Sequence, residues 1–276
     1  RSTDLDEMMF NYASANVREN NSLVPTNSNN TVDELQSYLG RVTLGIMDKY
    51  ILTGTVRADG STKFGPGNRY GIFPSFAAKW RISEEGFLPD AVDDLSLRVG
   101  YGVTGNQEFG HNLFTDRQRY GDWDIDQGGN INGGDVTQVA FANEDLKWES
   151  TTQFNAGLDL VMNNGKVSAS LDFYSKNTND LLIQLTSAQP APNPFVWTNL
   201  DADVINTGFE VALNYYPIDN SKFRWNIAAN AAYNENIVKN LGGLVINTGQ
   251  IDGQGLTGAF AQRIAEDQPL YAFFLR

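Results

Sequence analysis

Three aspartates at alternate positions, Asp122, Asp124 and Asp126, form the clearest cluster of metal-ligand residue types in the sequence. Spaced carboxylates supply the oxygen ligands that Ca²⁺ prefers. A calcium loop of the EF-hand type requires Gly at its sixth position and Glu at its twelfth, where this sequence has Gln127 and Gly133. The pattern therefore fits a solvated acidic loop better than a metal site. We assign no metal ligand, and whether the three carboxylates bind calcium stays open.

Side chains that could perform catalysis are scarce. His111 is the only histidine and the sequence has no cysteine, so it offers no His-based metal site, no thiolate and no disulfide. Asp59-Gly60-Ser61 and the glycine-rich stretch 242–258 lack the lysine and following helix of a phosphate-binding loop. Because no acid, base and nucleophile converge, we expect neither an enzyme nor a bound cofactor.

Four aromatic residues fall in segments that we expect to be long loops: Tyr120, Trp123, Phe195 and Trp197. Flat rings in a loop can stack on a ligand or contact a partner protein. Burial within the loop explains the same residues equally well. They are the only candidate binding residues that the sequence offers.

The composition limits the class of protein. The chain has 276 residues, enough for one large domain or two ordinary ones. It carries 20 basic and 33 acidic residues, a net charge of −13, which argues against a nucleic-acid partner. No stretch approaches the ~18 consecutive apolar residues of a membrane-spanning helix, and the first residues do not resemble a signal peptide.

Alternation of apolar and polar residues dominates the chain from residue 36 onward. It is clearest in a hairpin from Lys49 to Ser83, in which apolar and polar residues alternate along the strand before the loop 60–69 and along the strand after it. The same period recurs in the segments 36–46, 95–104, 148–162, 167–174, 209–215 and 223–234. Alternation over this length predicts strands that have one apolar and one polar face.

The connectors between these strands alternate in length. Short ones at 48–49, 83–94, 163–165 and 219–221 take turns with long ones at 60–69, 105–146, 178–203 and 238–258. In an up-and-down sheet the short connectors then lie at one edge and the long ones at the other, as in outer-membrane barrels. A soluble β-sandwich is the alternative, but its strands usually have about 5–6 residues. We therefore expect an all-β, antiparallel, up-and-down transmembrane β-barrel.

The first 35 residues differ from the rest. They are polar and rich in Asn, and we expect loop, with room for a short helix between Asp4 and Arg18. The predicted organisation is therefore loop over 1–35 and barrel over 36–276.

Several motifs in chain order resemble the SusC/RagA family of TonB-linked outer-membrane transporters of Bacteroidetes. They are the segments Arg57–Gly65, Asn68–Ser75, Trp80–Phe87, Leu97–Gln107, Leu146–Asp159, Asn206–Glu210 and Glu266–Phe274. Together they cover most of residues 36–276.

This resemblance implies a plugged barrel of about 22 strands in the bacterial outer membrane, of which the chain would supply about eight or nine. It also implies import of oligosaccharides or peptides beneath a SusD-like lipoprotein, powered by TonB. TonB would act through segments that this sequence does not include, since we find no plug domain, and the chain reads as an internal fragment. In such a barrel Tyr120, Trp123, Phe195 and Trp197 would contact the ligand or the lipoprotein lid. A passive or adhesive outer-membrane barrel remains the alternative function.

Overall fold

The computed structural model describes residues 32–110, 113–115, 142–185, 195–251, 253–255 and 258–274, and the backbone alone of 15–19, 22–26, 117–120, 123–125, 131–133, 136–140 and 186. The chain divides into two units, Arg1–Glu34 and Leu35–Arg276. Among the described residues there is no helix with the length and apolar content needed to cross a bilayer.

The first unit contains a two-stranded antiparallel sheet. Strand β1 (Ala15–Glu19) pairs with β2 (Ser22–Thr26), so that Val17 lies opposite Val24. The prediction of loop and helix is therefore wrong here, because Ala15–Arg18 is extended and not helical. The rest of the predicted helix, residues 4–14, lies outside the described residues.

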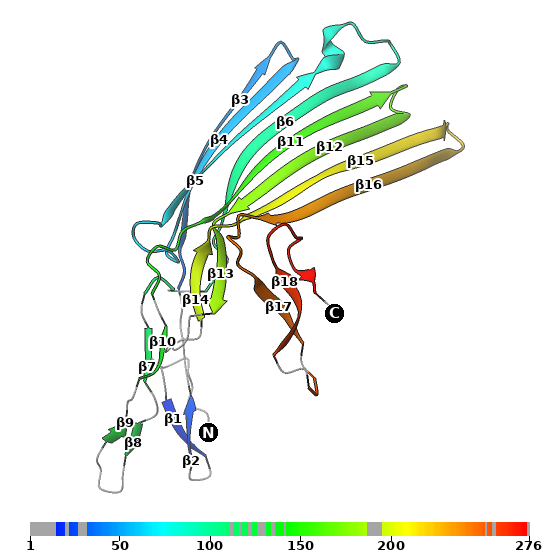
Figure 1. Cartoon of the computed structure of the whole chain (residues 1–276). Coiled ribbons are helices and arrows are strands. Elements are labelled where there is room, and N and C mark those ends of the chain that lie inside the picture. The colour runs from blue at the N-terminus through cyan, green and yellow to red at the C-terminus, as the bar shows by residue number, and fades with distance from the viewer. Residues whose placement is uncertain are drawn as a thin grey trace. The chain divides into compact units, whose positions relative to one another are not determined.

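The second unit is built on one eight-stranded antiparallel sheet in which neighbours in space are neighbours along the chain (Figure 1). Its strands follow in the order β3 (Leu35–Ile46), β4 (Tyr50–Ser61), β5 (Tyr70–Arg81), β6 (Val92–Asn106), β11 (Glu149–Met162), β12 (Val167–Asn179), β15 (Asp203–Asp219) and β16 (Arg224–Lys239). The predicted up-and-down topology is confirmed. Each strand has at least twelve residues, which exceeds the ~9–11 needed to cross a bilayer.

Strand register sorts the side chains of this sheet into two faces. One continuous row across all eight strands consists of Leu44, Leu52, Ala78, Val99, Ala156, Phe173, Phe209 and Tyr233. The adjacent row, one residue along each strand, consists of Thr43, Thr53, Ala77, Gly100, Asn155, Tyr174, Gly208 and Asn234. We call the face of the first row the apolar face and the face of the second the polar face.

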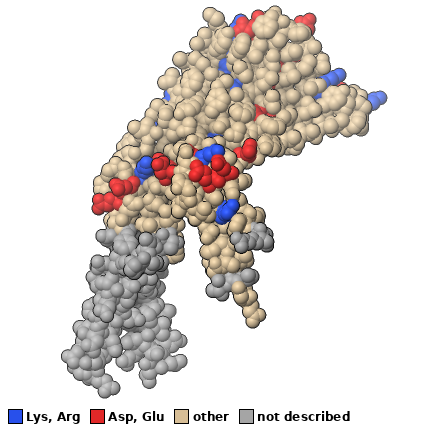
Figure 2. Space-filling view, viewed as in Figure 1, with Lys and Arg blue, Asp and Glu red and all other residues tan. Residues whose placement is uncertain are grey.

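The apolar face is covered by no other part of the described chain. Val42, Leu44 and Phe76 keep half or more of their surface exposed, and Leu171 keeps 49%. Figure 2 shows that charged side chains are sparse over the middle of the sheet in this view and gather toward the two ends of its strands. An exposed apolar band with charged side chains at both ends of its strands is typical of a lipid-facing barrel wall.

Residues with positive φ form two of the short connectors at one edge of the sheet. Met47 and Asp48 (φ 53° and 56°) lead from β3 to β4, and Asn163 and Asn164 (φ 56° and 57°) lead from β11 to β12. Two successive residues in this conformation match the right-handed twist of the strands they join. Between β5 and β6 the connector begins with the 3₁₀ turn η2 (Ile82–Glu85).

The long connectors at the other edge hold short strands of their own, which the sequence analysis assigned to loop. They are β7 (Arg117–Tyr120), β8 (Trp123–Ile125), β9 (Ile131–Gly133), β10 (Val136–Ala140), β13 (Leu181–Thr186) and β14 (Phe195–Leu200). After β16 come β17 (Ile246–Ile251), β18 (Ala259–Ile264) and β19 (Ala272–Phe273). Each of these strands pairs only within its own connector, apart from the eight-stranded sheet.

At the edge where the short connectors lie, one carboxylate accepts hydrogen bonds from three side chains and links the neighbouring strands. Glu85 of η2 accepts hydrogen bonds from Lys49 Nζ (2.8 Å), Tyr50 Oη (2.9 Å) and Trp80 Nε1 (3.1 Å). These bonds, that from Lys49 first, lower the pKa of Glu85 from 4.5 to about 2. Tyr50 and Trp80 stack at 6.3 Å on the apolar face, so Glu85 also holds two aromatic side chains at the membrane interface.

We predict that arginine substitutions at neighbouring positions of β12 have unequal effects. Leu171→Arg places a charge on the apolar face, where it costs about 2–4 kcal/mol at mid-membrane. Ser170→Arg places the same charge on the polar face and stays hydrated. Leu171→Arg should therefore lower the denaturant midpoint of the full-length barrel clearly more than Ser170→Arg. The reverse order would show that the register is shifted by one residue.

We predict that the contribution of Glu85 to stability depends on pH. Because its folded-state pKa lies below the unfolded value, the stabilisation is complete above about pH 4.5 and disappears as the pH falls toward 2. Glu85→Gln should lower the unfolding temperature at pH 7, and this deficit should shrink progressively below pH 4.5. Glu84→Gln, which removes a single ion pair to Arg81, is the matched control. A deficit that stays constant from pH 7 to pH 2 would refute the three-donor clamp.

Candidate functional site on the polar face of the sheet

The polar face carries hydroxyls, amides and nearly all of the charge that lies between the ends of the strands. Beside the row of Thr43, on the side of the long connectors, the next row of this face consists of Arg41, Thr55, Ser75, Gly102, Gln153, Lys176, Asn206 and Asn236. On the side of the short connectors, the next row consists of Gly45, Ile51, Lys79, Arg98, Gly157, Asp172, Glu210 and Ala232. Side chains of these types suit a hydrated lumen and not hydrocarbon.

Arg98 is the centre of a charge network that joins three strands. From β6 its Nε and Nη2 atoms donate to both carboxylate oxygens of Asp159 on β11, at 2.7 and 3.0 Å. The same Nη2 donates to Asp172 Oδ1 on β12 at 2.9 Å. A bidentate guanidinium–carboxylate pair fixes geometry as well as charge, so Arg98 holds β6, β11 and β12 in one register.

A glycine makes this network possible. Gly157 lies between Arg98 and Asp172 in the same row of the sheet. A Cβ at this position would be 2.3 Å from Asp172 Oδ1 and 2.8 Å from Arg98 Nη2. Only a residue without a side chain lets the guanidinium reach across β11 to the next strand.

Two hollows of opposite charge indent the polar face. The first, of about 470 Å³, is lined by side chains of β3 to β6 and β11, including Arg41, Lys79 and Arg98. The second, of about 410 Å³, is lined by β12, β15 and β16, including Asp172 and Glu210. The charged side chains that line the two hollows therefore have opposite sign, and the Arg98 network lies between them.

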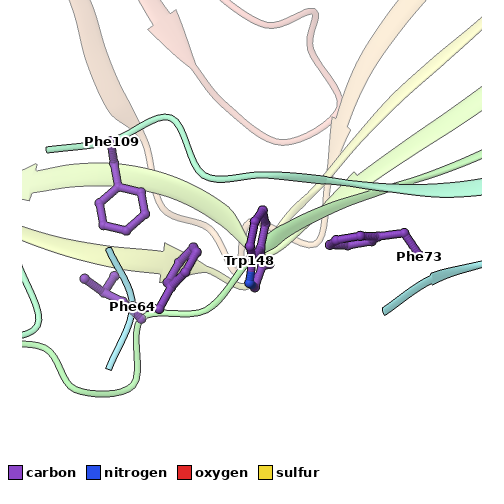
Figure 3. Packing of buried hydrophobic residues seen from close by; sticks show 5 residues of the cluster. Phe64, Phe73, Phe109 and Trp148 are labelled. Atoms are coloured by element: carbon purple, nitrogen blue, oxygen red, sulfur yellow. The ribbon is translucent and has the colours of Figure 1, made fainter. Parts of the chain in front are cut away.

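An aromatic cluster closes the end of the sheet where the long connectors emerge. Figure 3 shows Phe64 between Phe109 and Trp148, with Phe73 on the other side of Trp148. Phe64 is completely buried and its ring centroid lies 5.1 Å from that of each neighbour. The cluster packs three separate connectors against the start of β11, which makes their bases rigid.

Hydrogen bonds tie the β13–β14 hairpin to the same region. The Asn199 side chain donates to the carbonyls of Lys147 (2.8 Å) and Asp180 (2.9 Å) and accepts from the Lys147 amide (3.0 Å). Lys147 also pairs with Asp180 at 2.9 Å. The hairpin that carries two of the predicted binding aromatics is therefore anchored at its base.

The structure separates the four aromatic residues that the sequence singled out. Trp197 packs against the aromatic cluster with its ring 6.2 Å from Phe109, which favours the burial alternative for this residue. Phe195 remains 47% exposed near the start of β14. Tyr120 and Trp123 belong to β7 and β8, but their side chains lie outside the described part of the chain. The structure does not bring the four together into one site.

The acidic cluster and the histidine are not tested. Asp124 lies in β8 opposite Asn132, whereas Asp122, Asp126 and His111 fall outside the described residues. Within the residues that are described, no three acidic or histidine side chains are grouped to hold a metal ion. Calcium binding by the aspartates stays a prediction.

The residues with the strongest polar contacts were not predicted as a group. Alternation placed Arg98, Asp159 and Asp172 on the polar sides of their strands, but it gave no register between strands. The signal for their meeting is Gly157, a glycine in the row between two opposite charges. That signal can be read only after the strands are paired.

The sequence matches the family model described as "TonB dependent receptor-like, beta-barrel" over residues 3–265. It is 36% identical over 227 residues to "TonB-dependent receptor SusC" of Bacteroides thetaiotaomicron, covering 77% of this chain and 22% of that protein. It is 34% identical over 265 residues to "TonB-dependent receptor P39" of Formosa agariphila, covering 90% of this chain and 24% of the relative. The chain thus spans about a quarter or less of the length of these relatives.

The fold has counterparts among solved structures. The chain superposes on a structure of the RagAB peptide importer in the "open-open" state with a TM-score of 0.76, covering 93% of this chain and 27% of the other. It superposes on the "closed-closed" state with a TM-score of 0.73. Both are 24% identical in sequence, so they establish the barrel fold and nothing finer.

We predict that Gly157→Ala weakens the barrel by displacing Asp172 from Arg98. The loss should be about 1 kcal/mol in the free energy of unfolding, the value of one partly exposed ion pair. Gly54→Ala is the matched control, because no atom lies within 4 Å of the added methyl group. In a background of Asp172→Ala, Gly157→Ala should cost less than in the unmodified protein, because the methyl group then meets only Arg98. An equal loss in both backgrounds would show that the glycine serves another purpose.

Proposed function

Since the chain belongs to the TonB-dependent receptor β-barrel family, in its SusC/RagA group, we propose that it forms part of the barrel of a transporter importing oligosaccharides or peptides. The family places the chain in the bacterial outer membrane. The observation that carries the proposal is the eight-stranded sheet, with an uncovered apolar face and a charged polar face.

The two faces have separate tasks in this proposal. The apolar face contacts lipid, and each inner strand is hydrogen-bonded to a neighbour on both sides, as hydrocarbon requires. The polar face lines the lumen and contacts whatever crosses it. The aromatic cluster and the anchored β13–β14 hairpin give the extracellular mouth a fixed rim on which a lid can close.

Partners and boundaries belong to the same proposal. Residues 36–276 supply barrel wall, while a plug and a TonB-contact segment come from elsewhere in the full-length protein. A SusD-like surface lipoprotein covers the mouth, and TonB supplies the energy. Phe195, which is exposed at the start of β14, contacts the cargo or this lid. Further contacts of the same kind come from Trp197 in β14 and from Tyr120 and Trp123 in the connector between β6 and β11.

We predict that import by the full-length protein depends on TonB. Cells that grow on the imported nutrient should lose uptake when TonB is inactivated and also when the gene for this protein is deleted. The protein should copurify with the lipoprotein encoded beside it. Uptake that persists without TonB would instead identify a passive or adhesive outer-membrane barrel.

A further inference from the structure

Small residues carve the first hollow into the polar face. At its floor, facing positions on β5 and β6 are occupied by Ala77 and Gly100, and by Ser75 and Gly102. A side chain at Gly100 would be 2.4 Å from Asn155 Oδ1, so the absence of a side chain there leaves room for the amide. The volume, about 470 Å³, is within the usual range for a small-molecule site.

The lining of this hollow is cationic. Arg41, Lys79 and Arg98 line it, and among the described residues that line it there is no Asp or Glu. The chain as a whole carries a net charge of −13, so a surface with three cations and no carboxylate runs against its composition. We call this surface the cationic hollow.

Two of the three cations have donors to spare. Arg98 is neutralised by Asp159 and Asp172. Arg41 donates through Nε to Thr55 Oγ1 at 3.1 Å, a bond that leaves its charge uncompensated. Lys79 is half-buried and makes no ion pair among the described residues. Lys79 also acts electrostatically on Asp159, but that carboxylate is already bound by Arg98, so the ammonium group keeps donors for an anion from outside the chain.

The other polar groups indicate what else the ligand carries. Hydroxyls of Thr53, Thr55 and Ser75 and amides of Gln153 and Asn155 surround the cations. Such groups both donate and accept, as do sugar hydroxyls.

From this lining we infer that the cationic hollow is a lumenal subsite for the carboxylate of an acidic sugar residue in the imported oligosaccharide. The inference rests on the proposed function and narrows it to cargo that carries uronic acids. Arg41 and Lys79 would pair with the carboxylate, and the surrounding hydroxyls and amides with the ring hydroxyls.

The test is binding of monosaccharide probes to the full-length protein in detergent at low ionic strength. We expect D-glucuronate to bind at least fivefold more tightly than D-glucose, with the difference reduced by added salt. Lys79→Gln and Arg41→Gln should each weaken glucuronate binding roughly fivefold, about 1 kcal/mol, and leave glucose binding unchanged. Lys176→Gln is the matched control, because Lys176 is a cation of the polar face outside the lining of the hollow.

Three results would overturn the inference. In the first, glucuronate binds no better than glucose, or Lys79→Gln behaves as Lys176→Gln does. In the second, N-acetylglutamate binds as tightly as glucuronate and with the same dependence on Lys79, which assigns the hollow to acidic peptides. In the third, glucuronate does not bind and Lys79→Gln lowers the unfolding temperature, which shows that another part of the protein fills the hollow.

The result of this binding test can be distinguished from the result of the uptake test of the proposed function. Glucuronate binding that depends on Lys79 in a protein whose uptake does not require TonB would retain the subsite and remove the energised transporter. TonB-dependent uptake without glucuronate binding would retain the energised transporter and remove the subsite.

Discussion

In the hydrocarbon of a membrane no water is available to hydrogen bond a backbone amide, so every strand must be paired along its whole length. The eight long strands form one antiparallel sheet in which each strand is hydrogen-bonded to its neighbour from β3 to β16, with the shortest stretch of pairing between β5 and β6, over Ser75–Arg81. Pairing also fixes register, and register decides which side chain of each strand faces lipid. A shift by one residue would exchange Leu171 for Asp172 on the apolar face. The charge network, the hollows and the aromatic cluster all depend on this register.

The structure reinforces the register at three levels across the wall. At the edge with short connectors, Glu85 binds donors from the β3–β4 turn, β4 and β5. In the middle, Arg98 joins β6 to β11 and β12 across Gly157. At the other edge the cluster around Phe64 and Trp148 packs the connectors together. Polar contacts of this kind add little stability on a water-exposed surface. Here they favour one strand register over others that would form the same number of backbone hydrogen bonds.

The eight-stranded sheet could be predicted from the sequence because its signals are local. Alternation identifies each strand, and turn residues such as Asn163 and Asn164 mark the short connectors. The strands of the long connectors, β13 and β14 among them, were missed because they are short and pair only with each other. In the first unit, β1 was missed for the same reason, and the polar composition there suggested loop.

The site was less accessible from sequence. Arg98, Asp159 and Asp172 are separated by connectors of different length, and no local pattern specifies which residues face each other. For Trp197 the sequence left burial and ligand contact as equal alternatives, and its packing on Phe109 favours burial, whereas ligand contact stays a prediction. Aromatic residues in loops report burial or binding equally, and only the packing around them distinguishes the two.

The central claim is that these eight strands cross the outer membrane with their short connectors on the periplasmic side. Because the chain contains no cysteine, single cysteines can be introduced at exposed connector positions of the full-length protein after any others are removed. Gly67→Cys marks the long β4–β5 connector and Ser221→Cys the short β15–β16 connector. A membrane-impermeant maleimide added to intact cells should label the Gly67→Cys protein and should reach the Ser221→Cys protein only after the outer membrane is permeabilised. Labelling of Ser221→Cys but not of Gly67→Cys in intact cells would contradict the account.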